Sequence, residues 1–169
     1  MRKLITHDEI VEMCQNIGAE LTTKFKDKNP IVACVLKGAC PFHSELIKYL
    51  DMDVVVDYIQ ISSYEGTEST GVIKLKKDLE YDITGRDLII VEDIVDTGNT
   101  LSSLRPILEA KNPNSITFVS MLDKPSRRTV NFEADYVGRK IDDLFVIGFG
   151  LDLDEKYRNL PDIYVYNED

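Results

Sequence analysis

Hydrophobic residues recur along the chain with two different spacings, and these spacings predict alternating helices and strands. Thr6 and Glu9 form a capping-box pattern that predicts the start of a helix. The apolar residues that follow recur every three or four positions and so share one helical face: Ile10, Cys14, Ile17, Leu21 and Phe25. By contrast, the uninterrupted apolar runs at 31–36 and 88–91 have the length of buried strands.

The rest of the chain continues the alternation. Pro41 is suited to the first turn of a helix that continues to about residue 50, and a third helix is expected around 100–111. Pro106 lies inside that third helix and predicts a kink or a late start. Further strands are expected at 53–64, 72–79, 115–122, 134–141, 144–152 and 162–166, with a polar connection at 65–71. Strands with uninterrupted apolar sequences that alternate with helices indicate an α/β fold, with a mostly parallel sheet covered on both faces.

Composition restricts the class of protein. With 169 residues and 43% hydrophobic content, residues 1–169 are expected to form one domain. No apolar run approaches the roughly 18 residues that span a membrane, and the start of the chain lacks the apolar core of a signal peptide. Cys14, Cys34 and Cys40 form no paired pattern, so we expect reduced thiols in or near the core of a cytoplasmic protein. The net charge of −10 argues against nucleic acid as a partner.

The segment DLIIVEDIVDTGNT, residues 87–100, carries the strongest chemical signal. Buried carboxylates without partners are costly, so acids at the end of a buried strand indicate a crevice with a ligand in it. Backbone N–H groups of Thr97–Thr100, with the dipole of the following helix, are suited to a phosphate. Glu92 and Asp93 would repel that phosphate but could accept from vicinal hydroxyls, directly or through a metal. A phosphorylated ribose has both groups that the segment is suited to bind, hydroxyls for the acids and a phosphate for the turn.

This arrangement resembles the signature of the type I phosphoribosyltransferases. The segments VLKGACPF, SSY, GRDLIIVEDIVDTGNTL, DK and LFVIGFGLDLDEKYRNLP look like the hypoxanthine-guanine branch, and the resemblance extends from Leu4 to Tyr166. It implies a twisted, mostly parallel sheet flanked by helices, with a small hood formed by the N- and C-terminal segments. It also implies a Mg²⁺-dependent transfer of the 5-phosphoribosyl group from phosphoribosyl pyrophosphate to hypoxanthine or guanine. The products would be IMP or GMP and pyrophosphate, and the protein would be a homodimer or homotetramer.

The resemblance also implies roles for the segment just described. Glu92 and Asp93 would bind the ribose hydroxyls, and Asp96 would face the purine N7 as general base or proton acceptor. The 5′-phosphate would be bound by Thr97, Gly98, Asn99 and Thr100. Family members often carry a basic residue where Asn99 stands, but backbone donors do most of the binding there.

Roles elsewhere in the chain follow from the same resemblance. Lys37 and Gly38 would form the pyrophosphate loop, in which the peptide between Leu36 and Lys37 is often cis in the family. The sequence does not determine which isomer this protein has. Lys124 would donate to the purine 6-oxo group. Ser63 and Tyr64 precede a segment that resembles a mobile loop closing over the reacting centre. The remaining roles are stacking on the base by Phe145, contact with its edge by the Val146 backbone, pyrophosphate binding by Arg158, and Mg²⁺ ligation by Asp152 together with Glu92 and Asp93.

Three alternatives can be compared with this interpretation. A nucleotide-sensing regulator of the same fold would be expected to have a basic face for RNA, whereas this chain is acidic. A phosphatase of the haloacid dehalogenase type needs two aspartates separated by one residue, whereas two residues separate Asp93 from Asp96. A relative that prefers xanthine or adenine remains open, because the sequence does not determine the choice of purine.

Overall fold

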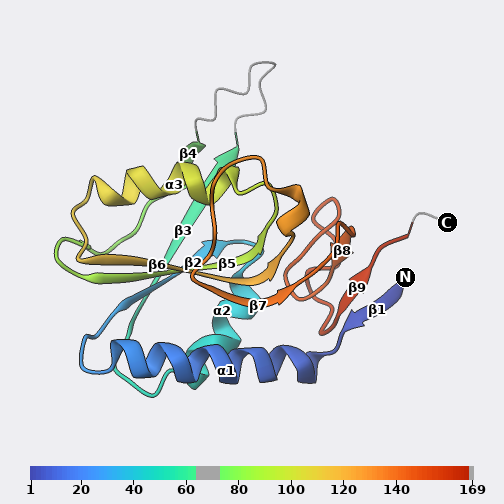
Figure 1. The fold of residues 1–169 in the computed structure, drawn as a ribbon, viewed down its shortest axis with the longest axis horizontal. Helices are drawn as coiled ribbons and strands as arrows, with labels where there is room; N and C mark the ends of the chain where they lie inside the picture. The colour runs from blue at the N-terminus through green and yellow to red at the C-terminus, as the bar shows by residue number, and fades with distance from the viewer. Residues whose placement is uncertain (64–72, 168–169) are drawn as a thin grey trace.

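The centre of the molecule is a six-stranded sheet. The computed structural model describes residues 1–63 and 73–167, and Figure 1 shows the sheet with helices on both of its faces. The strand order is β4-β3-β2-β5-β6-β7, and every neighbouring pair is parallel except β3 and β4. This confirms the predicted fold class and the strand that returns beside β3. The bounds are β2 Ile31–Leu36, β3 Val55–Ser63, β4 Ile73–Lys77, β5 Asp87–Val95, β6 Ser115–Asp123 and β7 Tyr136–Lys140.

Helices cover the sheet because its central strands are apolar on both faces. α1 (His7–Phe25) and α2 (Cys40–Leu46) lie on one face, and α3 (Asn99–Glu109) lies on the other (Figure 1). Successive side chains of β5 alternate between the two layers. Ile89 and Val91 pack in the cluster that contains α1, whereas Leu88 and Ile90 pack in the cluster that contains α3.

The predicted helix signals are largely confirmed. The Thr6 N–H donates to Glu9 at 2.8 Å and the Glu9 N–H donates to the Thr6 hydroxyl at 3.2 Å, which completes the capping box. Pro41 lies in the first turn of α2, and a 3₁₀ turn at Ile47–Tyr49 follows that helix. α3 begins at Asn99 and continues through Pro106, so the late start was wrong. The predicted apolar face of α1 is buried: Ile10, Cys14, Ile17, Leu21 and Phe25.

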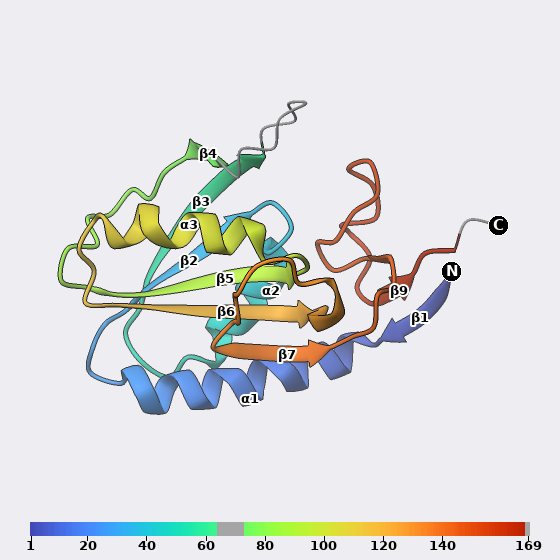
Figure 2. The same ribbon diagram turned by 45° about the horizontal axis from the view of Figure 1, so that its top comes forward.

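A second, smaller sheet forms the predicted hood. β1 (Arg2–Ile5), β9 (Ile163–Val165) and β8 (Val146–Ile147) pair antiparallel in the order β1-β9-β8. Figure 2 shows this sheet next to the carboxyl ends of the large sheet's parallel strands. β8 and β9 are shorter than the apolar pattern predicted, and β1 was not predicted because four residues give too little alternation to identify a strand.

The three cysteines are free, as expected, but they do not share one environment. Cys14 and Cys34 are buried, whereas Cys40 is exposed at the start of α2, so its assignment to the core was wrong. Across the described ranges, no helix has both the length and the apolar character needed to cross a membrane.

Candidate active site

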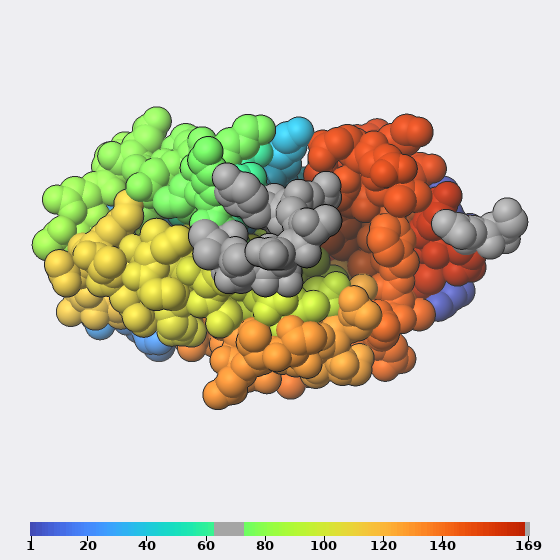
Figure 3. Space-filling view, turned by 90° about the horizontal axis from the view of Figure 1, so that it is seen from above, coloured from blue at the N-terminus to red at the C-terminus, as the bar shows by residue number. Residues whose placement is uncertain are grey.

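Three loops meet at the carboxyl ends of neighbouring strands. Lys37 and Gly38 follow β2, residues 96–98 connect β5 to α3, and Lys124 follows β6. Because β2, β5 and β6 are adjacent in the sheet, their ends bring these loops together. The end of β5, the turn after it and the start of α3 line a cavity of about 180 Å³, with lining residues from Glu92 to Leu101. In Figure 3 the surface is hollowed between the hood, in red, and the yellow-green segment that follows β5.

Glu92 and Asp93 are the energetically costly part of this site. They lie inside β5 rather than after it, and Glu92 is only 8% exposed. Glu92 accepts a hydrogen bond from the Asp93 N–H at 2.8 Å, and Asp93 accepts one from the Ile94 N–H at 2.6 Å. Burial, followed by the neighbouring Asp93 carboxylate, raises the pKa of Glu92 well above its usual value, and burial raises the pKa of Asp93. Within residues 1–63 and 73–167 neither carboxylate has a cation in an ion pair, so a ligand is the group that can compensate them.

Gly38 allows the loop after β2 to lie against Asp93. A Cβ atom at Gly38 would collide with the Asp93 carboxylate oxygen and would lie 3.6 Å from Arg158 Nη1. The peptide between Leu36 and Lys37 is cis, an isomer that the sequence alone left open. The Lys37 ammonium projects from this loop and pairs with Glu155 at 3.1 Å. Residues from β2, β5 and the hood therefore converge within one small volume.

The turn after β5 has the geometry of an anion site. Gly98 has a left-handed backbone, with φ of 86°, and it precedes the first residue of α3 without a side-chain cap. The first-turn N–H groups of an uncapped helix need another partner, and the helix dipole favours an anion there. The Asn99 N–H donates to the Thr97 hydroxyl at 3.3 Å, while Thr100 is exposed in the first turn. The predicted phosphate residues are thus adjacent to the acids, as the sequence required.

Asp96 has a partner that sequence reasoning missed. Arg127 Nε donates to the Asp96 carboxylate at 3.0 Å, and Arg127 Nη1 lies 3.8 Å from Asp143. Both members of the first pair are nearly half exposed, so the interaction is worth about 0–1 kcal/mol. Arg127 belongs to the loop that contains Lys124. Its closeness in sequence to that predicted site residue could have indicated that it also lies at the site.

The residues assigned to the purine lie in the loop after β6 and on the hood. Lys124 is 7% exposed, and its ammonium makes no ion pair with any residue in the described part of the chain. Phe145 is half exposed just before β8, whereas Val146 is buried within it. Tyr166 packs edge-on against Phe145 with ring centroids 6.1 Å apart, and the Tyr166 N–H donates to the Phe145 carbonyl at 2.9 Å. Tyr166 was not predicted as a site residue, although it falls within the strand predicted at 162–166.

Asp152 and Arg158 are held together on the hood. Arg158 Nη1 donates to the Gly150 carbonyl at 2.6 Å and lies 3.4 Å from Asp152 Oδ1. Arg158 Nη2 donates to Glu155 at 3.0 Å, so Glu155 bridges Arg158 and Lys37. The hydrogen bond from Arg158, followed by that from Lys37, lowers the pKa of Glu155. Glu155 was missed because a charged residue in a loop of many acids carries no distinguishing pattern.

Ser63 and Tyr64 lie at the boundary of the described residues. Ser63 is the last residue of β3, so its backbone lies at the same end of the sheet as the other loops. Tyr64 and the connection at 65–71 lie outside the described residues, and the prediction that this segment closes over the site stays a prediction.

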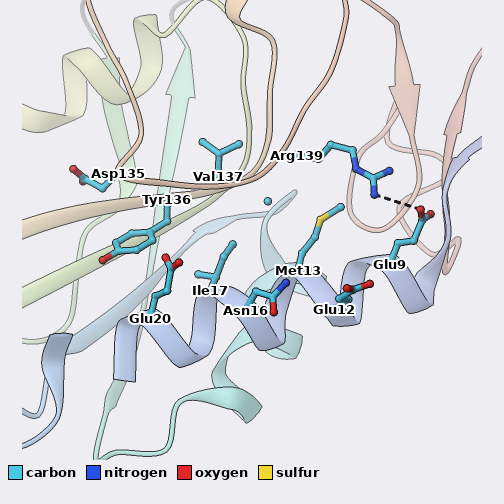
Figure 4. A pocket seen from close by; sticks show the side chains of 11 residues that line it. Glu9, Glu12, Met13, Asn16, Ile17, Glu20, Asp135, Tyr136, Val137 and Arg139 are labelled. Atoms are coloured by element: carbon cyan, nitrogen blue, oxygen red, sulfur yellow. Dashed lines mark hydrogen bonds and ion pairs between the residues drawn. The ribbon is translucent and has the colours of Figure 1, made fainter. Parts of the chain in front are cut away.

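A larger cavity lies elsewhere, between α1 and β7. It has a volume of about 460 Å³, and Figure 4 shows the acids that line it, Glu9, Glu12, Glu20 and Asp135. Its cation, Arg139, is 3.3 Å from Glu9 and is thus already paired. This cavity contains none of the residues predicted for the site, and its acidic lining would repel a phosphorylated substrate.

Comparison with known proteins agrees with this geometry. Residues 4–155 match the family described as the phosphoribosyl transferase domain. The hypoxanthine-guanine phosphoribosyltransferase of Streptococcus pneumoniae is 46% identical over 98% of this chain and 93% of its own length.

Solved structures are similar over nearly the whole chain. A hypoxanthine phosphoribosyltransferase from Staphylococcus aureus is 43% identical, with a TM-score of 0.95 over 99% of this chain and 91% of its own. A hypoxanthine-guanine phosphoribosyltransferase from Bacillus anthracis is 40% identical, with a TM-score of 0.95 over 99% of each chain. The chain therefore belongs to the phosphoribosyl transferase family, within its hypoxanthine-guanine branch.

Proposed function

We propose that this protein, as one domain of 169 residues, transfers the 5-phosphoribosyl group from phosphoribosyl pyrophosphate to hypoxanthine or guanine, releasing pyrophosphate and forming IMP or GMP. The observation that carries this proposal is the juxtaposition of two neighbouring acids with an uncapped helix start. Glu92 is buried, and neither Glu92 nor Asp93 forms an ion pair with the described residues. Glu92 and Asp93 accept from the ribose hydroxyls, while the N–H groups of Thr97–Thr100 bind the 5′-phosphate. Purine salvage in the cytoplasm by a homodimer or homotetramer is the setting we propose, and the free cysteines agree with a reducing compartment.

The reaction is a displacement at ribose C1. The bond from C1 to pyrophosphate breaks and the bond from C1 to purine N9 forms, so positive charge develops at C1. Lys37, the Gly38 backbone and Arg158 bind the departing pyrophosphate, and Asp96 accepts the proton that the purine loses. Catalysis of this kind depends on positioning and on charges fixed before the reaction.

The purine is selected by groups on two sides. Lys124 donates to the 6-oxo oxygen, which adenine lacks, so its buried ammonium favours hypoxanthine and guanine. The exposed face of Phe145 stacks on the base, and the Val146 backbone contacts the edge of the ring. Ser63 and Tyr64 lie at the start of the segment that we expect to exclude water.

The acids of the site suit Mg²⁺ bound together with substrate. Across the described residues no group of three or more His, Cys, Asp or Glu side chains could hold a metal ion alone. Glu92 and Asp93 have raised pKa values because they are buried, so a cation beside them would be stabilising. Mg²⁺ prefers a few carboxylates completed by phosphate oxygens and water, and Glu92, Asp93 and Asp152 would supply the protein's share. When bound, the ion would neutralise charge on the pyrophosphate.

The test is a set of steady-state rates with hypoxanthine, guanine, xanthine and adenine, each with phosphoribosyl pyrophosphate, with products separated by chromatography. We expect IMP and GMP to form in the presence of Mg²⁺ and turnover to stop in excess chelator. Addition of Mg²⁺ beyond the chelator should restore it. Full turnover in excess chelator would contradict the metal requirement, whereas failure with both 6-oxopurines would contradict the function.

A further inference from the structure

The loop after β6 supports the loop after β5 through three consecutive carbonyl groups. The Val95 carbonyl accepts from the Lys124 N–H at 2.9 Å, and the Thr97 carbonyl accepts from the Thr129 N–H at 3.0 Å. Between them, the Asp96 carbonyl accepts from Arg128 Nη1 at 2.8 Å. The first and last bonds join backbone to backbone, so they persist with any side chain. The middle bond depends on the identity of residue 128.

Arg128 is held firmly at this position by a buried acid. Its side chain is 12% exposed, and Nη2 donates at 2.7 Å to Asp123, whose side chain is 1% exposed. Asp123 is the last residue of β6, so the sheet itself fixes this carboxylate. The guanidinium is planar and rigid, and one nitrogen on each side of its fork therefore reaches Asp123 and the Asp96 carbonyl at the same time. A lysine ammonium has no such fork.

Gly98 fits the same arrangement. A Cβ atom at Gly98 would lie 2.9 Å from Arg128 Cδ, which is too close for an undisturbed contact. The glycine is thus required by the left-handed backbone and also by the stem of Arg128 beneath it. The phosphate turn rests directly on this arginine.

We propose that Arg128 is a positioning residue for phosphoribosyl transfer. In a trans peptide the N–H of one residue points away from the carbonyl of the residue before it. Holding the Asp96 carbonyl on the Arg128 side therefore turns the Thr97 N–H to the opposite side, where the 5′-phosphate is proposed to bind. The same bond fixes the backbone that carries the Asp96 carboxylate. Because Lys124 begins the loop that holds Arg128, this residue also links the purine and phosphate parts of the site.

The inference rests on the proposed function, and its test measures the contribution of the 5′-phosphate. The quantity is the dissociation constant of inosine divided by that of IMP, obtained by calorimetry for IMP and by competition for inosine. In Arg128→Lys the positive charge beside Asp123 is kept, but the ammonium cannot also reach the Asp96 carbonyl. We expect this ratio to fall about tenfold or more, as for loss of a hydrogen bond to a charged group. We also expect kcat/KM for phosphoribosyl pyrophosphate to fall about 100-fold, the size of effect that misplaced groups produce.

A second variant tests whether an unpaired buried charge, by misfolding the protein, could account for the result. The double substitution Arg128→Gln with Asp123→Asn removes both buried charges together, so no buried carboxylate is left unpaired. Glu133, 3.8 Å from Arg128, is 70% exposed and remains solvated. The same fall in the ratio is expected. Arg139→Gln is the matched control, because it also removes an arginine bonded to a carboxylate, but Arg139 lies on β7 and pairs with Glu9 of α1 (Figure 4). It should leave the ratio unchanged.

The outcomes separate this inference from the proposed function. A purely structural role would reduce the amount of active protein and would affect inosine and IMP equally. An unchanged ratio in folded Arg128→Lys, or equal losses for the two ligands, would overturn the inference while the unaltered protein remained active. Failure of the unaltered protein to use hypoxanthine or guanine would instead overturn the proposed function.

Discussion

Replacing Glu92 with glutamine should stabilise the free protein while it weakens substrate binding. Glu92 is buried beside Asp93, and both carboxyl groups have raised pKa values because of burial. Glutamine has nearly the same volume, and its amide oxygen can still accept from the Asp93 N–H, now 2.8 Å from the glutamate. Its amide nitrogen can donate to the Asp93 carboxylate. The substitution thus removes a buried charge and the repulsion between two acids, yet leaves no polar group unpartnered.

The size of the effect follows from this environment. Relief of strain at a functional site commonly adds about 0.5–2 kcal/mol to the free energy of unfolding. For a chain of this length each kcal/mol raises Tm by about 2–4 °C, so we expect a Tm about 1–8 °C higher at pH 7. Substrate binding by the variant is expected to be weaker, because the glutamine amide is a weaker acceptor for a ribose hydroxyl and a poorer ligand for Mg²⁺ than the carboxylate. KM for phosphoribosyl pyrophosphate should rise more than kcat falls.

The pH dependence distinguishes this mechanism from better packing. The folded protein holds the Glu92 proton more tightly than the unfolded chain does, since its pKa is raised on folding. Stability from this group is therefore greatest below the unfolded pKa of about 4.3 and declines as pH rises toward the folded pKa. Glutamine does not titrate, so the advantage of the Glu92→Gln variant should be near zero at about pH 4 and should grow as pH increases.

The measurement is thermal and urea unfolding between pH 4 and 8, in chelator and without substrate. Glu109→Gln is the control, because Glu109 is an exposed acid on α3 and its replacement should change Tm little at any pH. A lower Tm for Glu92→Gln at pH 7 would refute the reasoning. So would a gain that is the same at every pH, because the buried charge could not then be its source.

Two further predictions concern the reacting groups. Lys124→Ala should lower kcat/KM for hypoxanthine about 10- to 100-fold, as expected for a charge-assisted hydrogen bond of about 1.5–3 kcal/mol, and should affect phosphoribosyl pyrophosphate binding far less. Equal losses in the binding of both substrates would mean that Lys124 serves the fold or the phosphate. Asp96→Asn should lower kcat about 10²- to 10⁴-fold with IMP affinity kept within about tenfold, as for loss of a general base. A folded Asp96→Asn variant that reacts at the original rate would mean that the purine proton leaves by another route.

The parts of the fold that follow from local patterns were predictable. The unbroken apolar run at 88–91 required burial on both faces, and β5 is an interior strand of the sheet with side chains packed in both core layers. The capping box at Thr6 and Glu9 located the start of α1 to the residue. These features depend on interactions between residues close in sequence, which a pattern of spacing records directly.

The partners of the site residues were not predictable in the same way. Arg127 meets Asp96 across 31 positions, and Glu155 meets Lys37 across 118. The residues next to Arg127 and Glu155 in the sequence do not indicate which side chain each of them will contact. Only the folded structure brings these pairs together. The position of Glu92 and Asp93 inside β5 was missed for a related reason, because β6 pairs with β5 beyond the apolar run and extends the strand to Val95.

The carboxylates of the site fall into two groups with different consequences for binding. Asp96, Asp123 and Asp152 each lie within 4 Å of an arginine side chain, whereas Glu92 and Asp93 have no ion-pair partner within the described residues. The exposed pair at Asp96 is worth about 0–1 kcal/mol, so in the proposed function a purine would displace Arg127 from it at little cost. Glu92 and Asp93 would behave in the opposite way, because burial makes their charge destabilising in the free protein and a ligand's hydroxyls or cation would relieve it. In the proposed function, substrate binding would therefore break a weak contact at the base and stabilise two costly charges at the ribose, and this difference would favour the occupied site.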